Sequence, residues 1–168
     1  MKKALALILA LVMVFALCAC GGGGDSASGE KVVKIGVFEP ASGDSGAGGK
    51  KEMLGMQYAN QETPTVEIGG ETYKVELVYS DNGSDSAKAV SAASKLVNEK
   101  VSLVLGSYGS GVSIAAADTF AEAQIPAIGV SCTNASVTDG HDWYFRICFL
   151  DPFQGSVMAQ FAWDIVAA

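Results

Sequence analysis

Residues 101–120 read VSLVLGSYGSGVSIAAADTF, and this stretch contains the pattern that decides the fold. Val101–Leu105 is a short apolar run, which is typical of a strand covered on both faces in a parallel sheet. The Gly- and Ser-rich loop Gly106–Gly111 follows it, and the segment Gly111–Ala123 then has the length and composition of a helix. A strand, a loop and a helix in this order form one unit of an α/β fold.

The same alternation precedes this unit. An apolar run predicts a strand over Val32–Phe38, followed by a Gly-rich loop over Glu39–Gly49 and a helix over Lys50–Glu62. The segments Thr65–Ile68 and Thr72–Tyr79 flank two glycines, which tolerate positive φ, and this predicts a hairpin.

A further helix is predicted from about residue 85 to residue 99, because its alanines, Leu96 and Val97 recur at intervals of three and four residues. Either Ser84 or Asp85 is suited to cap its start. After residue 120 the sequence predicts strands over Ala127–Val130 and Tyr144–Ile147 and a helix from about Phe153. Strands that alternate with helices predict a doubly wound, parallel α/β sheet with right-handed crossovers.

The N-terminus predicts export. Lys2 and Lys3 precede the apolar stretch Ala4–Ala19, which is shorter than the ~20 residues that a membrane-spanning helix needs. We therefore expect residues 1–19 to be a cleaved signal peptide and residues 20–30, which are rich in Gly and Ser, to be a flexible tether. Residues 17–20, Leu-Cys-Ala-Cys, resemble a bacterial lipobox, which implies lipid attachment at Cys20. An ordinary secretory signal or a short membrane anchor is the alternative.

Composition constrains the mature chain that begins at Cys20. About 149 residues remain after cleavage, which suits one domain, and nine basic against eighteen acidic side chains give them a formal net charge of −9. Nucleic acid and anionic headgroups are poor partners for such a surface, although solubility alone explains the charge. Cys132 and Cys148 can form a disulfide or remain free thiols. His141 is the only histidine, so we expect neither a metal site nor a cofactor.

A binding site is expected at the carboxyl ends of the parallel strands. Three loops follow predicted strands there: Pro40–Gly49, Gly106–Gly111 and Ser131–Asn134. The second leads into a helix whose first N–H groups favour an anion, and Ser110 adds a hydroxyl donor, so a small carboxylate fits. The third offers Thr133 in the same way. A capped helix start or an ordinary turn would explain either loop without a ligand.

Enzyme templates do not match these loops. The segment Gly43–Lys51 is one residue too long for a phosphate loop and lacks its Ser or Thr, and neither G-x-G-x-x-G nor G-x-S-x-G occurs in register. His141 lies in a turn composition that is more typical of a solvated residue than of a general base. We therefore expect a protein that is not an enzyme.

From Lys34 to Gly155 the chain resembles the leucine/isoleucine/valine-binding branch of extracytoplasmic solute-binding proteins, the receptors of amino-acid ABC importers. The resemblance rests on an ordered series of short motifs: Ile35-Gly36-Val37, Ser42-Gly43, Gly55, Val104-Leu105-Gly106, Ile125-Pro126, Ser131 to Asn134, and Phe145-Arg146 followed by Asp151, Gln154 and Gly155.

The resemblance implies a type I periplasmic-binding-protein-like fold, in which two α/β lobes close on the ligand. It places Ser110 on the α-carboxylate of an amino acid, with Gly109 beside it, and gives Ser131 and Thr133 backbone and hydroxyl contacts. Tyr108 is expected either to form an aromatic wall or, more simply, to pack on its neighbours. Arg146 and Asp151 are expected to be structural, because an arginine inside an apolar strand usually satisfies nearby carbonyls.

Members of that family are more than twice as long as this chain. We therefore expect only the first lobe, at residues 31–152, and a helix at 153–168 that leads toward a second lobe and exposes apolar side chains. The predicted function is a lipid-anchored receptor that delivers a small aliphatic amino acid to an ABC permease. The alternatives are a sensor domain of the same fold or a truncated fragment that does not bind; a secreted hydrolase is disfavoured.

Overall fold

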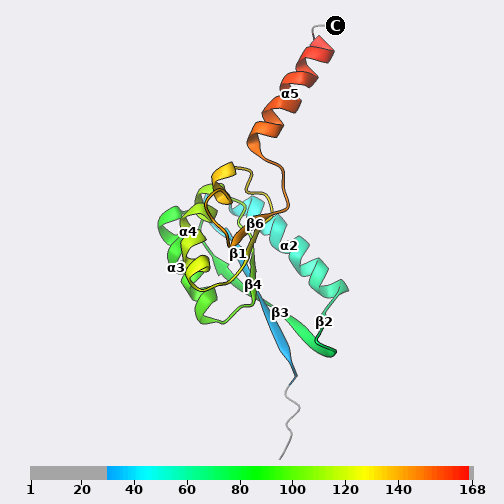
Figure 1. Cartoon of the computed structure of the whole chain (residues 1–168), viewed down its shortest axis with the longest axis vertical. Coiled ribbons are helices and arrows are strands. Elements are labelled where there is room, and N and C mark those ends of the chain that lie inside the picture. Colours follow the sequence, from blue (N-terminus) through cyan, green and yellow to red (C-terminus); the bar gives the residue numbers. More distant parts are fainter. Residues whose placement is uncertain (1–29, 167–168) are drawn as a thin grey trace, which may run out of the picture. The chain divides into compact units, whose positions relative to one another are not determined.

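Six strands form one sheet in the order β2-β3-β1-β4-β5-β6 in the computed structural model, which describes residues 30–166 (Figure 1). The strands are β1 (Val32–Glu39), β2 (Thr65–Ile68), β3 (Glu71–Asp81), β4 (Leu103–Leu105), β5 (Ala127–Gly129) and β6 (Tyr144–Arg146). All neighbouring pairs are parallel except β2 with β3, which is the predicted hairpin. In register, Val37 of β1 lies between Tyr79 and Leu105.

Helices cover both faces of this sheet. They are α2 (Gly46–Glu62), α3 (Ser86–Asn98) and α4 (Ser110–Glu122), and a 3-10 turn, η1 (Ala135–Val137), follows β5. Figure 1 shows α2 on one face and α3 with α4 on the other. Ile35 faces Met56 of α2 across a small apolar cavity, whereas Phe38 packs on the α4 side. The prediction of a doubly wound α/β sheet is therefore confirmed.

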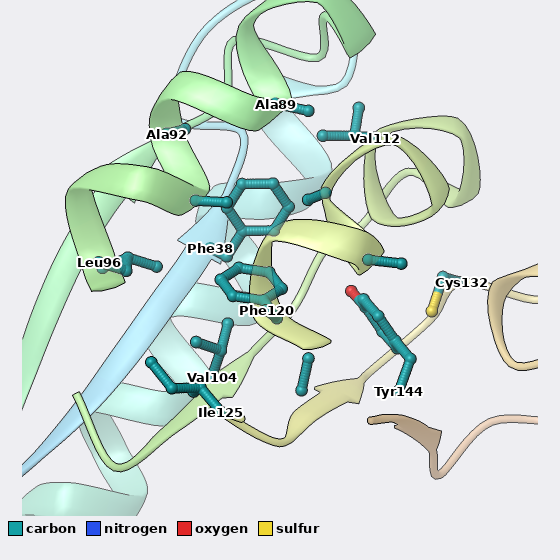
Figure 2. Packing of buried hydrophobic residues seen from close by; sticks show 14 of the residues in the cluster. Phe38, Ala89, Ala92, Leu96, Val104, Val112, Phe120, Ile125, Cys132 and Tyr144 are labelled. Carbon is teal, nitrogen blue, oxygen red and sulfur yellow. The ribbon is translucent and has the colours of Figure 1, made fainter. Parts of the chain in front are cut away.

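The main core lies between the sheet and the pair α3 and α4 (Figure 2). At its centre the rings of Phe38 and Phe120, both fully buried, meet edge to face with centroids 5.5 Å apart. Alanines on the buried sides of α3 and α4, such as Ala93 and Ala116, let these helices approach one another closely. The carboxylate of Asp85 caps α3 by accepting the N–H of Ala87 at 2.8 Å, which settles the choice of cap.

Two predicted boundaries were wrong around the first loop. Glu39 belongs to β1, and α2 begins at Gly46 rather than Lys50. The early start depends on close packing, because a Cβ on Gly49 would lie 2.3 Å from the carbonyl oxygen of Pro40. Glycine therefore lets the first turn of the helix rest against the preceding loop.

The last helix, α5 (Asp151–Val166), begins two residues earlier than predicted. Within the described residues it has no buried side chain, and the expected exposure of apolar groups is confirmed, with Phe161 60% and Trp163 70% exposed. Among the helices of residues 30–166, none combines the length and the apolar character needed to cross a membrane. The predicted signal peptide and lipid site, and nearly all of the tether, fall outside the described residues.

Candidate functional site

The carboxyl edge of the sheet contains a reversal of strand order. The chain passes from β1 outward to β3 and then returns across β1 to β4, so β1 and β4 are neighbours at the point where the order changes. The loops after these two strands diverge to opposite faces, and such a point is where open α/β sheets form a crevice for ligands. The loops after β1, β4 and β5 are the three that were predicted to carry the site.

Ser110 is the first residue of α4, and it joins two of these loops. Its hydroxyl oxygen accepts a hydrogen bond from the backbone N–H of Asn134 at 3.2 Å, which ties the loop after β4 to the loop after β5. The cap residue, Gly109, has extended backbone angles, and no side chain of residues 30–166 caps this helix start. The start of α4 therefore differs from that of α3, where Asp85 takes the cap position.

An uncapped helix start has consequences for ligands. The first N–H groups of a helix lack intrahelical partners and carry partial positive charge, so they favour an anion. The Ser110 hydroxyl uses one lone pair for Asn134 and keeps its proton for another acceptor. This corner of the molecule thus offers neutral donors to a small carboxylate.

Tyr108 connects the same loop to β1 and α2. Its backbone N–H donates to Oε2 of Glu39 at 2.8 Å. Its ring lies against Gly48, where a Cβ would be 2.5 Å from Cζ of the tyrosine, and the residue is 43% exposed. Tyr108 therefore packs on a neighbouring helix while part of its ring faces solvent.

The loop after β5 holds the other two predicted site residues. The Ser131 hydroxyl donates a short hydrogen bond to Oε1 of Glu52 in α2, and the Thr133 carbonyl accepts the N–H of Asp151 at 3.0 Å. Both residues are partly exposed. The structure thus gathers Tyr108, Ser110 and Ser131 at one edge of the sheet, through contacts that do not require a ligand.

Glu39 and Glu52 bond to two residues of the candidate site, Tyr108 and Ser131, and the sequence patterns did not point to either glutamate. Glu39 is only 1% exposed at the end of β1. Burial raises the pKa of its carboxyl well above the usual range, and hydrogen bonding with Glu52 and the charge of Glu52 raise it further, against the opposing bond from Tyr108. An acidic residue at the end of an apolar run, directly before Pro40, was the available signal.

A second polar cluster supports the loops after β1 and β3. Buried Asn82 donates through Nδ2 to the Ser107 hydroxyl at 3.0 Å. Beside it, the Asp81 carboxylate accepts the N–H groups of Ala41 and Gly83, each at 2.8 Å, and the Ser42 hydroxyl at 2.7 Å. One exposed aspartate thereby fixes the loop that leads into α2.

Arg146 organises the loop after β5, as the sequence predicted for an arginine within a strand. Its guanidinium donates to the carbonyls of Cys132, Asn134 and Ala135 at 2.9–3.1 Å and to the Thr138 hydroxyl at 2.6 Å. These bonds satisfy the backbone groups of a segment that has no ladder partner. The predicted structural role of Arg146 is confirmed.

The described cysteine and histidine side chains form no metal-binding cluster at this edge. Cys132 and Cys148 are both free thiols, so of the two predicted alternatives the structure has the thiols and not the disulfide. The Nδ1 atom of His141 lies 3.2 Å from the Val137 carbonyl. In the part of the chain that the structure describes, no three acidic, cysteine or histidine side chains come together as metal ligands would.

Comparison with known proteins agrees with this architecture. The family model described as periplasmic binding protein matches residues 32–165. Among solved structures, a leucine-binding protein LivK from Thermotoga maritima is 38% identical with a TM-score of 0.74, and the match covers 82% of this chain and 38% of that one. A branched-chain amino acid transporter substrate-binding protein LivJ from Streptococcus pneumoniae, in complex with isoleucine, is 33% identical with a TM-score of 0.73 and coverages of 82% and 40%.

Curated relatives have the same relation to the chain. A Leu/Ile/Val-binding protein homolog 2 of Brucella abortus is 32% identical over 133 residues, and an amino acid binding protein of Pseudomonas aeruginosa is 32% identical over 139 residues. These matches cover 79% and 81% of this chain but 36% and 37% of the relatives, so the chain spans little more than a third of their length. The sheet order and the extent of these matches show that the chain belongs to the periplasmic binding protein family. It shares the type I fold of that family's members over their N-terminal part.

Proposed function

We propose that this chain carries the carboxylate-binding lobe of an extracytoplasmic receptor that serves an ABC importer. The observation that carries the proposal is the uncapped start of α4, where Gly109 leaves the first N–H groups free and Ser110 is held against Asn134. The ligand carboxylate accepts hydrogen bonds from these N–H groups and from the Ser110 hydroxyl. No chemical step follows binding.

The proposed ligand is a small aliphatic amino acid. The residues assigned to it, Tyr108–Ser110 together with Ser131 and Thr133, offer neutral donors and no basic side chain. Neutral donors suit a carboxylate whose charge is already balanced by an ammonium group of the same molecule, whereas a dicarboxylate would leave a charge uncompensated. The similarity to LivK and to LivJ with isoleucine supports the same class of ligand.

Lobe closure is the proposed mechanism. A ligand that contacts two lobes stabilises their closed arrangement over the open one by the difference in its affinity for the two states. The lobe described here supplies the carboxylate half of those contacts. By itself it therefore binds weakly, because the ammonium partner and the exclusion of water are contributed by the other half.

An NMR titration of the chain tests the site. L-leucine is expected to shift the backbone amide signals of Gly109–Val112 and of Asn134, with millimolar affinity. L-leucinol, which lacks the carboxylate, serves as the control and should leave the α4 signals unchanged. Equal shifts with leucinol, or shifts confined to another surface, would contradict the proposed site.

We also propose that Cys20 carries a lipid that holds the receptor beside its permease. Labelled palmitate should be incorporated by bacteria that express the chain, and Cys20→Ala should abolish the labelling. Cys18→Ala is the matched control, because it changes the other cysteine of the same segment without removing the acceptor. Labelling that persists in Cys20→Ala would exclude this anchor.

A further inference from the structure

Two carboxyl groups meet beneath the loops that carry the candidate site. Glu39 lies at the end of β1 and Glu52 on α2, and each uses one oxygen to hold a different loop. Oε2 of Glu39 accepts the N–H of Tyr108 at 2.8 Å, and Oε1 of Glu52 accepts the Ser131 hydroxyl. A series of four neighbouring residues thus links the loop after β4 to the loop after β5: Tyr108, Glu39, Glu52 and Ser131.

The two remaining carboxyl oxygens have no donor. Oε1 of Glu39 and Oε2 of Glu52 are both buried, and within residues 30–166 neither has a hydrogen-bond partner when both groups are taken as ionised. Glu52 is nevertheless the neighbour whose side chain and charge raise the pKa of the Glu39 carboxyl beyond the effect of burial. One proton placed between the two inner oxygens satisfies both of them and removes the repulsion between two buried like charges.

Within residues 30–166, no cationic side chain bonds to these two oxygens. The charge of Glu39 acts on the hydroxyl of Tyr144 in β6, and the Cys132 thiol of the loop after β5 acts on the same hydroxyl. Burial raises the pKa of Tyr144 above its usual range and that of the Cys132 thiol to about 11, so both are neutral near pH 7. Among the described residues, no lysine, arginine or histidine contributes to the shift at Glu39.

We propose that Glu39 and Glu52 share one proton, and that this pair is a strut that sets the spacing between the Tyr108 loop and the Ser131 loop. Both are positioning residues, because they act on the candidate ligand groups through Tyr108 and Ser131. The positioning role rests on the proposed ligand site, whereas the shared proton does not depend on it. Loss of the proton places two negative charges in contact and separates the loops.

The proton makes both stability and loop geometry depend on pH. The folded pair keeps a proton that an unfolded glutamate releases near its ordinary pKa, so the folded state binds one proton more above that pH. The unfolding equilibrium constant therefore increases with pH, by up to tenfold for each pH unit, until the folded pair also releases its proton. Burial is the main cause that moves this release to higher pH.

The decisive measurement is carbon NMR of the chain with labelled glutamate δ carbons, titrated from pH 4 to pH 10. We expect one carboxyl signal pair to keep a proton beyond pH 7, and the amide signals of Tyr108 and Ser131 to move with the same midpoint. In Glu39→Gln, whose side-chain amide donates to Glu52 permanently, this titration should disappear and the pH dependence of unfolding should become flatter. Glu76→Gln, at an exposed position of β3, is the matched control and should behave as the wild type.

The outcomes separate the two proposals. Ordinary titration of every glutamate, or an unchanged pH profile in Glu39→Gln, would overturn the shared proton. A titrating pair without any movement of the Tyr108 and Ser131 amides would overturn the strut. Failure of every variant to respond to L-leucine would count against the proposed function alone, since the carboxyl titration requires no ligand.

Discussion

The hydroxyl oxygen of Ser110 accepts the backbone N–H of Asn134 at 3.2 Å, so the start of α4 and the loop after β5 are held together by one bond. The two residues are 24 positions apart and follow neighbouring strands, β4 and β5. This bond orients the hydroxyl at the point where the first N–H groups of α4 are uncapped. The corner is therefore organised before any ligand arrives, which lowers the entropy lost on binding.

Ser110→Ala should weaken binding of L-leucine. The substitution removes the proposed hydrogen bond to a charged carboxylate, and such a bond contributes about 1–3 kcal/mol, or roughly 5- to 150-fold in affinity. Amide-shift titration of the two chains measures the ratio. Ser94→Ala is the control, because the Ser94 hydroxyl bonds only to the Val90 carbonyl on the exposed side of α3. Equal affinity of the Ser110 variant and the wild type would show that the helix start is no more than a turn.

Gly106→Ala should destabilise the fold by about 2 kcal/mol or more. Gly106 has φ of +115°, and a Cβ there would lie 2.2 Å from the Phe38 carbonyl oxygen, where β1 and β4 adjoin. Gly55→Ala in α2 is the matched control, since its Cβ would meet nothing within 4 Å. Alanine at that helical position should stabilise by about 0.5–1 kcal/mol. Urea denaturation of both variants checks this opposite sign, and a Gly106 variant as stable as the wild type would contradict the close approach.

Arg146→Ala should destabilise the chain by about 2–3 kcal/mol, because three carbonyls and a hydroxyl lose a charged donor. Arg146→Lys should recover only part of this loss, since an ammonium cannot reproduce the planar fork. Amide hydrogen exchange should become faster over residues 132–138 while β1 and β3 stay protected. Lys34→Ala removes a surface ion pair with Glu99 and a hydrogen bond to its carbonyl, and should cost at most about 1 kcal/mol. Uniformly faster exchange in the Arg146 variant would mean that the residue does not act on this loop in particular.

The order of elements could be predicted because it depends on local patterns. Alternation of apolar runs with helical spacing identifies each strand and helix, and parallel strands place their carboxyl ends at one edge. The position of Ser110 at that edge follows directly. The boundaries at Glu39 and Gly46 could not be predicted in the same way. The end of β1 at Glu39 depends on the neighbouring Glu52, and the start of α2 at Gly46 depends on the contact of its first turn with Pro40.

The contacts within the site were beyond the reach of sequence patterns. Ser131 bonds to Glu52 across 79 residues, and Glu39 reaches Tyr108 across 69. Such pairs are set by the register of distant strands and by the direction of α2, which no local spacing records. An acidic residue at a strand end also contradicts the expectation that buried residues are apolar, and violations of this kind are most frequent at functional sites.

Asp81→Asn should loosen the loop that leads into α2 and change the response to acid. Partial burial raises the pKa of Asp81, but bonds from the Ser42 hydroxyl and from the N–H groups of Gly83, Ala41 and Ser42 outweigh it, so its pKa lies below the usual value. A lowered pKa in the folded state gives stability that is present above the unfolded pKa, near 3.8, and is lost as pH falls through the folded value. Glu39 changes stability with pH in the opposite sense, but only above the ordinary glutamate pKa, so acidification below pH 4 isolates the contribution of Asp81.

At pH 6 the Asp81 variant should be about 1 kcal/mol less stable in urea than the wild type, and its further loss of stability between pH 4 and pH 2 should be smaller. Asp118→Asn, at an exposed position of α4, should match the wild type at both pH values. Identical acid sensitivity of the Asp81 variant and the wild type would show that this carboxylate does not hold the loop.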